Sequence, residues 1–366
     1  MSAGFSSFDL DYKIVNVLER LGLTEPTPIQ AQAIPVIMNG RDVIGIAQTG
    51  TGKTLAFGLP LIQKMIGNQQ RALIIAPTRE LVLQIEKSLK AITHALPVSF
   101  KIASVIGGMP QYRQVKELRA GARLIVATPG RLVDLMEQKL VSLHNTNYLV
   151  LDEADRMFDM GFAPQMKRII GAITIPHQTL LFSATMTAPV VSLAAAYQHN
   201  PQRIEVSPAN TGVASITHQL HYVSKEGKLD SLRRILAGEH KSVLVFSRTK
   251  HGANKLRARI EQMGHKAAEI HSNKSLNQRR QALDGFRSGQ YRVLVATDVA
   301  SRGIDVPDIG LVVNYDLPDA PEDYIHRTGR TGRAGKTGQA ISLATFEQKG
   351  LVLQIERLMR QSISTS

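Results

Sequence analysis

The chain has 366 residues, of which 43% are hydrophobic, and its 44 lysines and arginines outnumber its 30 aspartates and glutamates. The net charge of +14 favours a polyanionic partner, because lysine and arginine make most phosphate contacts, although charge that serves only solubility would look the same. The absence of cysteine excludes disulfides and thiolate metal sites. No run has the length of a membrane span and no signal peptide is recognisable, so we expect a cytoplasmic protein.

Short apolar, β-branched runs alternate with longer amphipathic segments along the whole chain. Strands are predicted, in chain order, at residues 43–46, 72–76, 102–105, 124–127, 148–151, 179–183, 243–246, 266–270, 293–296, 311–314 and 340–343. Helical patterns lie between them, for example at 80–91 and 229–236, and a last helix is predicted at about 348–360. This alternation predicts an α/β protein with mostly parallel sheets flanked by helices.

A polar stretch with proline and glycine at 207–212 interrupts the alternation, with several predicted strands on each side. Because 366 residues exceed one typical hydrophobic core, we expect two domains at 1–206 and 215–366, joined by a linker at 207–214. The net charge is +5 through Ala214 and +9 from Ser215 onward, so the second half carries more of the positive field.

A glycine-rich loop follows the first predicted strand and precedes an apolar helical segment. Its residues are Ala47, Gln48, Thr49, Gly50, Thr51, Gly52, Lys53 and Thr54. In such a loop the backbone N–H groups cradle phosphates, the lysine reaches the β and γ oxygens, and the hydroxyl at Thr54 holds Mg²⁺. The strict pattern begins with glycine, where this chain has Ala47.

The predicted strand at 148–151 runs directly into Asp152, Glu153, Ala154 and Asp155. The carboxyl ends of parallel strands share one edge, so these carboxylates should lie beside the phosphate loop. Asp152 would then orient the Mg²⁺ shell, and Glu153 would polarise an attacking water. Alone, such a cluster is usually a solvated helix start, but together with the loop it indicates nucleotide hydrolysis.

These four residues read D-E-A-D, and from here the chain resembles the DEAD-box RNA helicases over nearly its whole length. The resemblance implies two tandem RecA-like domains, with ATP and Mg²⁺ as cofactors. The segment 22–30 resembles the family's adenine motif, in which Gln30 reads the adenine edge. Leu23 stands where many members have a stacking aromatic, and either Phe5 or Phe8 matches the family's upstream aromatic.

Three further segments of the first half resemble motifs that hold the RNA backbone. The candidate RNA-binding residues there are Pro77, Thr78, Arg79, Gly108, Thr128 and Arg131, with Gly107 beside Gly108. Hydroxyls, arginines and backbone N–H groups suit phosphates and carry little base information. Ser183 and Thr185 resemble the motif that links the ATP site to the RNA site, and the resemblance implies hydrogen bonds from their hydroxyls to the acidic cluster at Asp155.

The second half resembles the family's remaining motifs. By this resemblance Arg248 and Thr297 would meet RNA, and Gly303 and Asp305 would approach the ribose and phosphates of ATP. Arginines 327, 330 and 333 share a three-residue spacing, which would put them on one face of a helix. The family pattern makes Arg330 and Arg333 arginine fingers on the γ-phosphate.

Two departures fall in one segment of the second half. Ser272 and Leu276 replace the usual glycine and glutamine, so Leu276 is not a candidate site.

The two halves of the expected ATPase site lie on different domains, so ATP and RNA should close the cleft together, which predicts RNA-stimulated hydrolysis and local rather than processive strand separation. A monomer is the default expectation. An ATP-gated RNA clamp would carry the same catalytic residues, and a DNA translocase would share the core. Specificity for RNA depends on contacts with the 2′-hydroxyl, which no sequence pattern here reveals. Within the family, the chain most resembles bacterial RhlE-type members with a minimal core.

Overall fold

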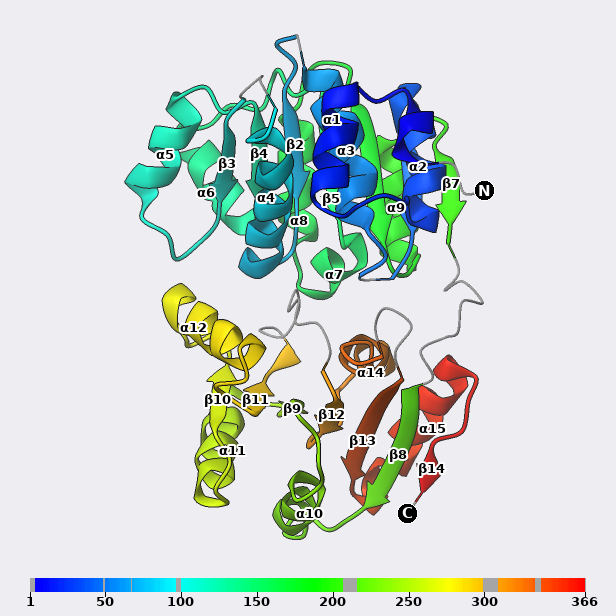
Figure 1. The fold of residues 1–366 in the computed structure, drawn as a ribbon, viewed down its shortest axis with the longest axis vertical. Coiled ribbons are helices and arrows are strands. Elements are labelled where there is room, and N and C mark those ends of the chain that lie inside the picture. The colour runs from blue at the N-terminus through cyan, green and yellow to red at the C-terminus, as the bar shows by residue number, and fades with distance from the viewer. Residues whose placement is uncertain are drawn as a thin grey trace. The chain divides into compact units, whose positions relative to one another are not determined.

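The computed structural model describes residues 4–48, 50–66, 68–96, 100–206, 216–298, 309–332 and 337–365. The chain divides into two compact units, Met1–Pro208 and Ala209–Ser366, which are taken here one at a time (Figure 1). The predicted linker at 207–214 lies outside the described residues. Within the described part of the chain, no helix is both long and apolar enough to cross a membrane.

The first unit alternates strands and helices after a short helical N-terminal segment. Its helices are η1 Phe5–Phe8, α1 Tyr12–Arg20, α2 Pro28–Met38, α3 Lys53–Met65, α4 Arg79–Thr93, α5 Gln111–Arg119, α6 Pro129–Glu137, α7 Ala154–Asp159, α8 Ala163–Gly171 and α9 Ala188–Tyr197. Its strands are β1 Val43–Ile46, β2 Ala72–Ile75, β3 Ile102–Val105, β4 Leu124–Ala127, β5 Tyr148–Asp152, β6 Gln178–Ser183 and β7 Gln202–Glu205.

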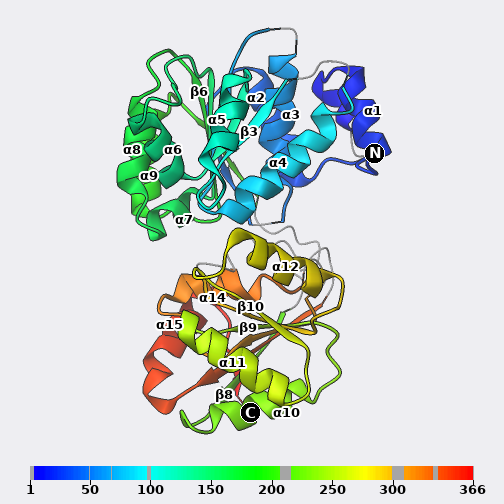
Figure 2. The same cartoon turned by 90° about the vertical axis from the view of Figure 1, so that its left-hand side faces the viewer.

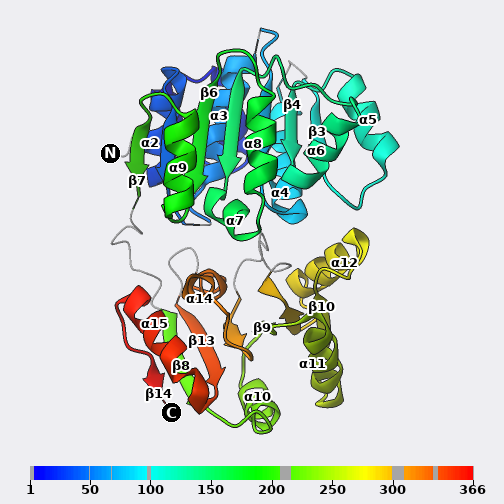
Figure 3. The same ribbon diagram turned by 180° about the vertical axis from the view of Figure 1, so that it is seen from behind.

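These seven strands form one sheet in the order β3-β4-β2-β5-β6-β1-β7, and every pairing is parallel. Alternate strand residues point to opposite faces. Leu73, Leu149 and Leu181 therefore share one face, where they pack with apolar side chains of α6, α8 and α9. Figure 3 shows these helices in front of the sheet, and Figure 1 shows α3 and α4 on the other side. The sheet is covered on both faces, so its carboxyl edge is where polar residues can gather.

The second unit repeats this plan with a separate sheet. Its helices are α10 Lys228–Leu236, α11 Lys250–Gln262, α12 Leu276–Arg287, α14 Pro321–Thr328, η2 Phe346–Gln348 and α15 Lys349–Met359. Its strands are β8 Ile216–Tyr222, β9 Val243–Phe246, β10 Ala267–Ile270, β11 Val293–Ala296, β12 Leu311–Asn314, β13 Gly338–Ala344 and β14 Ser364–Thr365. The strand order is β10-β11-β9-β12-β13-β8-β14, again with parallel pairings throughout the described residues.

Two separate apolar layers hold this second sheet. Val243, Val245 and their neighbours pack against α10 and α11 on one face, whereas Leu244 and Phe246 meet α12 on the other. Helix α11 and helix α12 can be followed on either side of β9 and β10 in Figure 2. The α14 and α15 helices form a further cluster around Tyr324, which is fully buried. The predicted α/β architecture with two parallel sheets is thus confirmed.

Each predicted strand is present, with ends within two residues of the prediction, but three strands were missed. β7, β8 and β14 lie at or next to a sheet edge, where one face or flank stays polar. The sequence of β7, for example, reads Q-R-I-E and buries only Ile204. Such strands lack the continuous apolar run by which buried parallel strands are recognised.

Candidate functional site

The glycine-rich loop joins the carboxyl end of β1 to the first turn of α3, as predicted. Gly50 and Gly52 have φ angles of 88° and 93°, a left-handed conformation that favours glycine. The Lys53 ammonium is buried and donates a hydrogen bond to the Ala47 carbonyl oxygen at 2.9 Å. Lys53 therefore lies across the loop, so the loop and its lysine form one preorganised unit.

Gln30 ties the N-terminal motif to this loop. The side chain is buried, its Nε2 donates to the Gly52 carbonyl at 3.0 Å, and its Oε1 accepts from the Thr27 backbone N–H at 2.9 Å. An amide has two N–H bonds and two lone pairs, so half of its hydrogen-bonding capacity is used within the chain. Of the two upstream aromatics, Phe5 is buried and Phe8 is half-buried against it.

The acidic cluster begins at the last residue of β5. Asp152 and Glu153 are both buried, and the Glu153 backbone N–H donates to Asp152 Oδ1 at 3.0 Å. Burial raises the pKa of Asp152 to about 7; Lys53 opposes the rise, and the carboxyl groups of Glu153 and Asp155 add to it. Lys53 and the acidic cluster thus interact electrostatically, and a cation near Asp152 would reduce the repulsion between the carboxylates.

Asp155 joins β5 to the segment after β6. Its Oδ2 accepts from the Thr185 hydroxyl and backbone N–H, each at 2.9 Å, and from the Ala184 N–H at 3.2 Å. Ser183 Oγ accepts from the Asp155 N–H at 3.2 Å and donates to the Thr185 carbonyl at 2.8 Å. The hydrogen bond predicted from Thr185 to Asp155 is therefore present. Ser183 contacts the Asp155 backbone instead of its carboxylate.

The candidate RNA residues of the first unit follow its other strands. Thr78 caps α4, accepting from the Leu81 N–H at 3.2 Å, and Pro77 precedes it. The Arg79 guanidinium packs on Gly107 and Gly108; a Cβ on Gly108 would lie 2.6 Å from Arg79 Nη1. These two glycines therefore let the arginine lie flat on the backbone.

Two more candidates follow β4. Thr128 is the buried N-cap residue of α6, and Arg131 lies in the first turn of that helix. Arg131 pairs with Asp134 and donates to Gln111 Oε1 at 3.1 Å. The arginine is thus held at the edge by side chains of α5 and α6.

Strand order divides the carboxyl edge of the first sheet into two parts. The nucleotide candidates follow β1, β5 and β6, whereas the RNA candidates follow β2, β3 and β4. Because β2 and β5 are neighbours, the two groups meet at the acidic cluster. The nucleotide and RNA candidates therefore form one continuous row of strand ends.

In the second unit Arg248 and Thr297 follow β9 and β11, which are adjacent strands. The Arg248 side chain is about half exposed and lies 3.5 Å from Asp319. Thr297 is buried, and its backbone N–H donates to the Ile270 carbonyl at 3.2 Å. Both residues lie at the carboxyl edge of their sheet, and their contact with RNA stays a prediction.

The expectation that three arginines share one helix face is wrong. Helix α14 ends at Thr328, so Arg327 is helical and Arg330 lies beyond the helix. Just past Arg330, Thr331 forms a bridge with Ile309 and donates to its carbonyl at 2.5 Å. This bridge draws the chain away from the helical path. Arg330 is buried, and its Nε donates to the His326 carbonyl at 3.3 Å.

Arg327 was not among the predicted site residues, yet its buried guanidinium makes four hydrogen bonds. Its Nε and Nη2 donate to the two carboxylate oxygens of Asp298 at 2.5 and 2.7 Å. Its Nη1 donates to Asn314 Oδ1 at 3.1 Å and to the Asp316 carbonyl at 2.6 Å, and its guanidinium lies over the Phe246 ring. Arg327 therefore holds the carboxyl ends of β11, β12 and β9 together.

Four predicted site residues lie outside the described part of the chain: Thr49, Gly303, Asp305 and Arg333. Leu276 and Leu23, which depart from the family's usual residues, lie within the described part of the chain. Leu276 is the first residue of α12, directly after Ser275, whose side chain caps the helix. Leu23 is 37% exposed.

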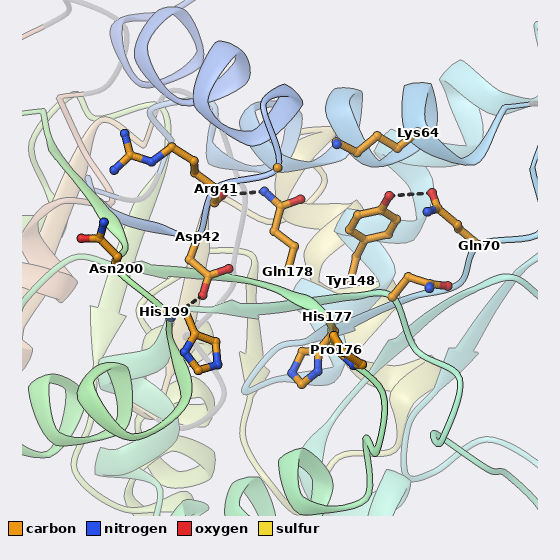
Figure 4. A pocket seen from close by; sticks show the side chains of 12 residues that line it. Arg41, Asp42, Lys64, Gln70, Tyr148, Pro176, His177, Gln178, His199 and Asn200 are labelled. Carbon is orange, nitrogen blue, oxygen red and sulfur yellow. Dashed lines mark hydrogen bonds between the residues drawn. The ribbon is translucent and has the colours of Figure 1, made fainter.

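A cavity of about 560 Å³ lies at the opposite, amino edge of the first sheet (Figure 4). Its lining residues include Asp42, Tyr148 and Gln178, which stand just before or at the start of β1, β5 and β6. Asp42 accepts from the His199 backbone N–H at 2.7 Å and from the Thr179 N–H at 2.8 Å. Because the loop and the carboxylates are at the other edge, this cavity is not the candidate site.

Comparison with known families agrees with this geometry. Residues 27–193 match the DEAD/DEAH box helicase family, and residues 227–335 match the helicase conserved C-terminal domain. The chain is 39% identical to the DEAD-box ATP-dependent RNA helicase CshA of Bacillus subtilis, over 99% of this chain and 74% of that protein. This chain belongs to the DEAD-box RNA helicases. The ATP-dependent rRNA helicase RRP3 of Candida albicans is 40% identical to this helicase, over 98% and 68% of the two chains.

Solved structures resemble the helicase over nearly its full length. Dbp5 of S. cerevisiae bound to RNA and ADP BeF3 matches with a TM-score of 0.87 and 30% identity, covering 99% of this chain and 95% of Dbp5. Mss116p bound to single-stranded RNA and AMP-PNP matches with a TM-score of 0.89 and 27% identity, covering 100% and 79%. Bacterial, yeast and plant relatives match at similar identity, so the RhlE-type subgroup stays a prediction.

Proposed function

We propose that this RNA helicase couples ATP hydrolysis to local, non-processive separation of RNA strands. The observation that carries the proposal is the divided carboxyl edge of the first sheet, with nucleotide candidates on one side of the acidic cluster and RNA candidates on the other. Asp155, bound by three donors from the segment after β6, lies where the two groups meet. We infer that Ser183, Thr185 and Asp155 transmit the state of the nucleotide to the RNA side.

Each nucleotide-site residue has a distinct role in this proposal. Lys53 exchanges its hydrogen bond with Ala47 for the β and γ phosphate oxygens, and the loop from Thr49 to Thr54 supplies backbone N–H groups. Gln30 reads the adenine edge with the N–H and the lone pair of its amide that are not used by Gly52 and Thr27. Glu153 orients the attacking water and accepts its proton.

Mg²⁺ fits the residues present. Asp152 offers the oxygens of a buried carboxyl group, and its burial opposes ionisation unless a cation is near. Thr54 offers a hydroxyl one residue after Lys53. Magnesium is usually held by one or two carboxylates together with substrate phosphates, and these two residues match that pattern. When bound, the ion would offset charge on the phosphate oxygens.

The second unit supplies the remaining contacts in this proposal. Arg330 and Arg333 neutralise charge that develops on the γ-phosphate, and Gly303 and Asp305 meet the ribose and phosphates. Arg248 and Thr297, with the first-unit residues 77–79, 108, 128 and 131, hold the RNA backbone. The domain limits that we propose are 1–206 and 215–366, with the linker at 207–214. A cytoplasmic location remains a prediction from the sequence.

A duplex-unwinding assay tests this function. A short RNA duplex should separate in the presence of ATP and stay paired with Glu153→Gln, because loss of a general base lowers the rate of hydrolysis by about 10²- to 10⁴-fold. An ATP-gated clamp is the alternative. It would stay bound to single-stranded RNA for longer than many cycles of ATP hydrolysis take, and it would not separate the duplex. That outcome would replace unwinding by clamping as the main role.

A further inference from the structure

Arg156, directly after the D-E-A-D residues, is among the largest fully buried side chains of the chain. It lies in α7, and only 2% of its surface is exposed. A guanidinium stays charged at any pH the fold tolerates. A buried charge is costly unless an opposite charge and hydrogen bonds compensate it, so the surroundings of Arg156 must contain a counter-charge.

That counter-charge is Glu153. Arg156 Nε lies 3.6 Å from Glu153 Oε2, and both side chains are at most 4% exposed. Within the described residues, the two terminal nitrogens of Arg156 have no hydrogen-bond partner, and no other carboxylate is within ion-pair distance of its guanidinium. The charge of Arg156 is therefore balanced through the one residue proposed to activate water.

The backbone makes this pairing possible. Glu153 has φ 53° and ψ 52°, a left-handed conformation that is costly for a residue with a Cβ and that persists only where the surroundings fix it. This single residue turns the chain from β5 into α7. Glu153 and Arg156 are then three residues apart at the start of one helix, a spacing at which side chains meet.

We propose that Arg156 is a positioning residue for Glu153, which it holds in the orientation needed to activate water. The proposal rests on the proposed role of Glu153. A separation of 3.6 Å is an ion pair and not a hydrogen bond, so Arg156 orients the carboxylate without consuming one of its lone pairs. Arg156 also offsets the repulsion between Glu153 and the neighbouring buried carboxyl groups of Asp152 and Asp155, so its loss should change the orientation of the Glu153 carboxylate.

A double-mutant cycle on unfolding tests the pairing independently of catalysis. The variants are Glu153→Gln, Arg156→Met and the double variant, measured in the full chain without nucleotide. Glu153→Gln leaves a buried charge uncompensated, so Arg156→Met should be better tolerated in that background than in the wild type. We expect a coupling of at least about tenfold in the folding equilibrium constant. Additive effects would overturn the pairing.

Kinetics test the positioning. Arg156→Met should lower the RNA-stimulated kcat by roughly 10- to 100-fold and leave the KM for ATP within about twofold, because the ground-state contacts to ATP remain. Arg156→Lys keeps the charge and should recover most of kcat. The control is Arg123→Met, since Arg123 is half-buried in the same unit but bonds to backbone carbonyls near α3 and should leave kcat unchanged.

Three results would contradict the proposal. The first is an unchanged kcat in Arg156→Met. The second is a fall in kcat/KM that a rise in KM explains. The third is an Arg156→Lys variant no more active than Arg156→Met. If Arg156→Met does not fold, Arg156→Gln, which also removes the charge, takes its place, and the same fall in kcat at an unchanged KM is expected. If Glu153→Gln still hydrolyses ATP while the cycle shows coupling, the pair stands and the proposed role of Glu153 falls.

Discussion

Gly52 requires glycine for two separate reasons, conformation and packing. Gly50 and Gly52 share a left-handed backbone, but only at Gly52 would a Cβ meet other atoms, 2.4 Å from Gln30 Nε2 and 2.9 Å from Thr27 Oγ1. Gly52→Ala should therefore lose the ~1–2 kcal/mol that any L-residue loses in this conformation, and also the Gln30 contact. Gly50→Ala should lose only the first.

Unfolding free energies and binding of an ATP analogue measure this difference. Gly52→Ala is expected to weaken nucleotide binding more than Gly50→Ala does. Equal losses in the two variants would mean that Gln30 does not hold the loop.

Thr185 is the residue-scale test of coupling. Its hydroxyl donates to the buried Asp155 carboxylate, and a hydrogen bond to a charged group contributes about 1.5–3 kcal/mol. Thr185→Val should lower the number of duplexes separated per ATP hydrolysed. Thr187→Val is the matched control, because the Thr187 side chain makes no capping hydrogen bond. The same yield per ATP in both variants would exclude a coupling role for Thr185.

At the scale of elements, one arginine holds the second unit's strand ends together. Arg327 is 2% exposed and makes four hydrogen bonds to segments after β11 and β12. Lysine keeps the charge but cannot reproduce this fork, so Arg327→Lys leaves buried acceptors unpaired and should destabilise the second unit by about 1–3 kcal/mol. Arg248→Lys alters an exposed pair and should change the unfolding free energy by less than about 1 kcal/mol. Denaturant unfolding followed by tyrosine fluorescence distinguishes the two variants. Similar losses of unfolding free energy would show that Arg327 does not hold the strand ends together.

The contact between β8 and α14 predicts a pH dependence. His218 is buried beside Tyr324, with Nδ1 3.1 Å from the phenol oxygen, and burial lowers the pKa of His218 from its ordinary value of 6.5. The unfolded chain then takes up the proton first as the pH falls. Stability contributed by neutral His218 is present above pH 6.5 and is lost as the pH drops towards the lower folded-state pKa.

His218→Gln should therefore flatten the fall in unfolding free energy below about pH 6.5. Burial also lowers the pKa of His271 and of other histidines, so the test is the difference between variant and wild type. A difference that is constant from pH 5 to about pH 8 would show that His218 does not titrate in this way.

At the scale of the whole molecule, the sequence predicted what lies at strand ends, since a motif that follows a buried apolar run must emerge at the carboxyl edge. This holds for Lys53, Asp152 and Thr185. It failed where partners come from distant segments. The role of Arg327 depends on burial and on Asp298 and Asn314, and no spacing rule brings these residues together.

We expect hydrolysis of ATP to depend on RNA, because candidate residues for both ligands lie along one sheet edge and the remaining candidates lie in the second unit. The most direct test is the steady-state rate of ATP hydrolysis with and without single-stranded RNA, with single-stranded DNA as control and Glu153→Gln as the inactive reference. RNA should raise the rate, DNA should not, and the variant should stay inactive. Equal stimulation by DNA, or rapid hydrolysis indifferent to nucleic acid, would show that hydrolysis does not depend on RNA.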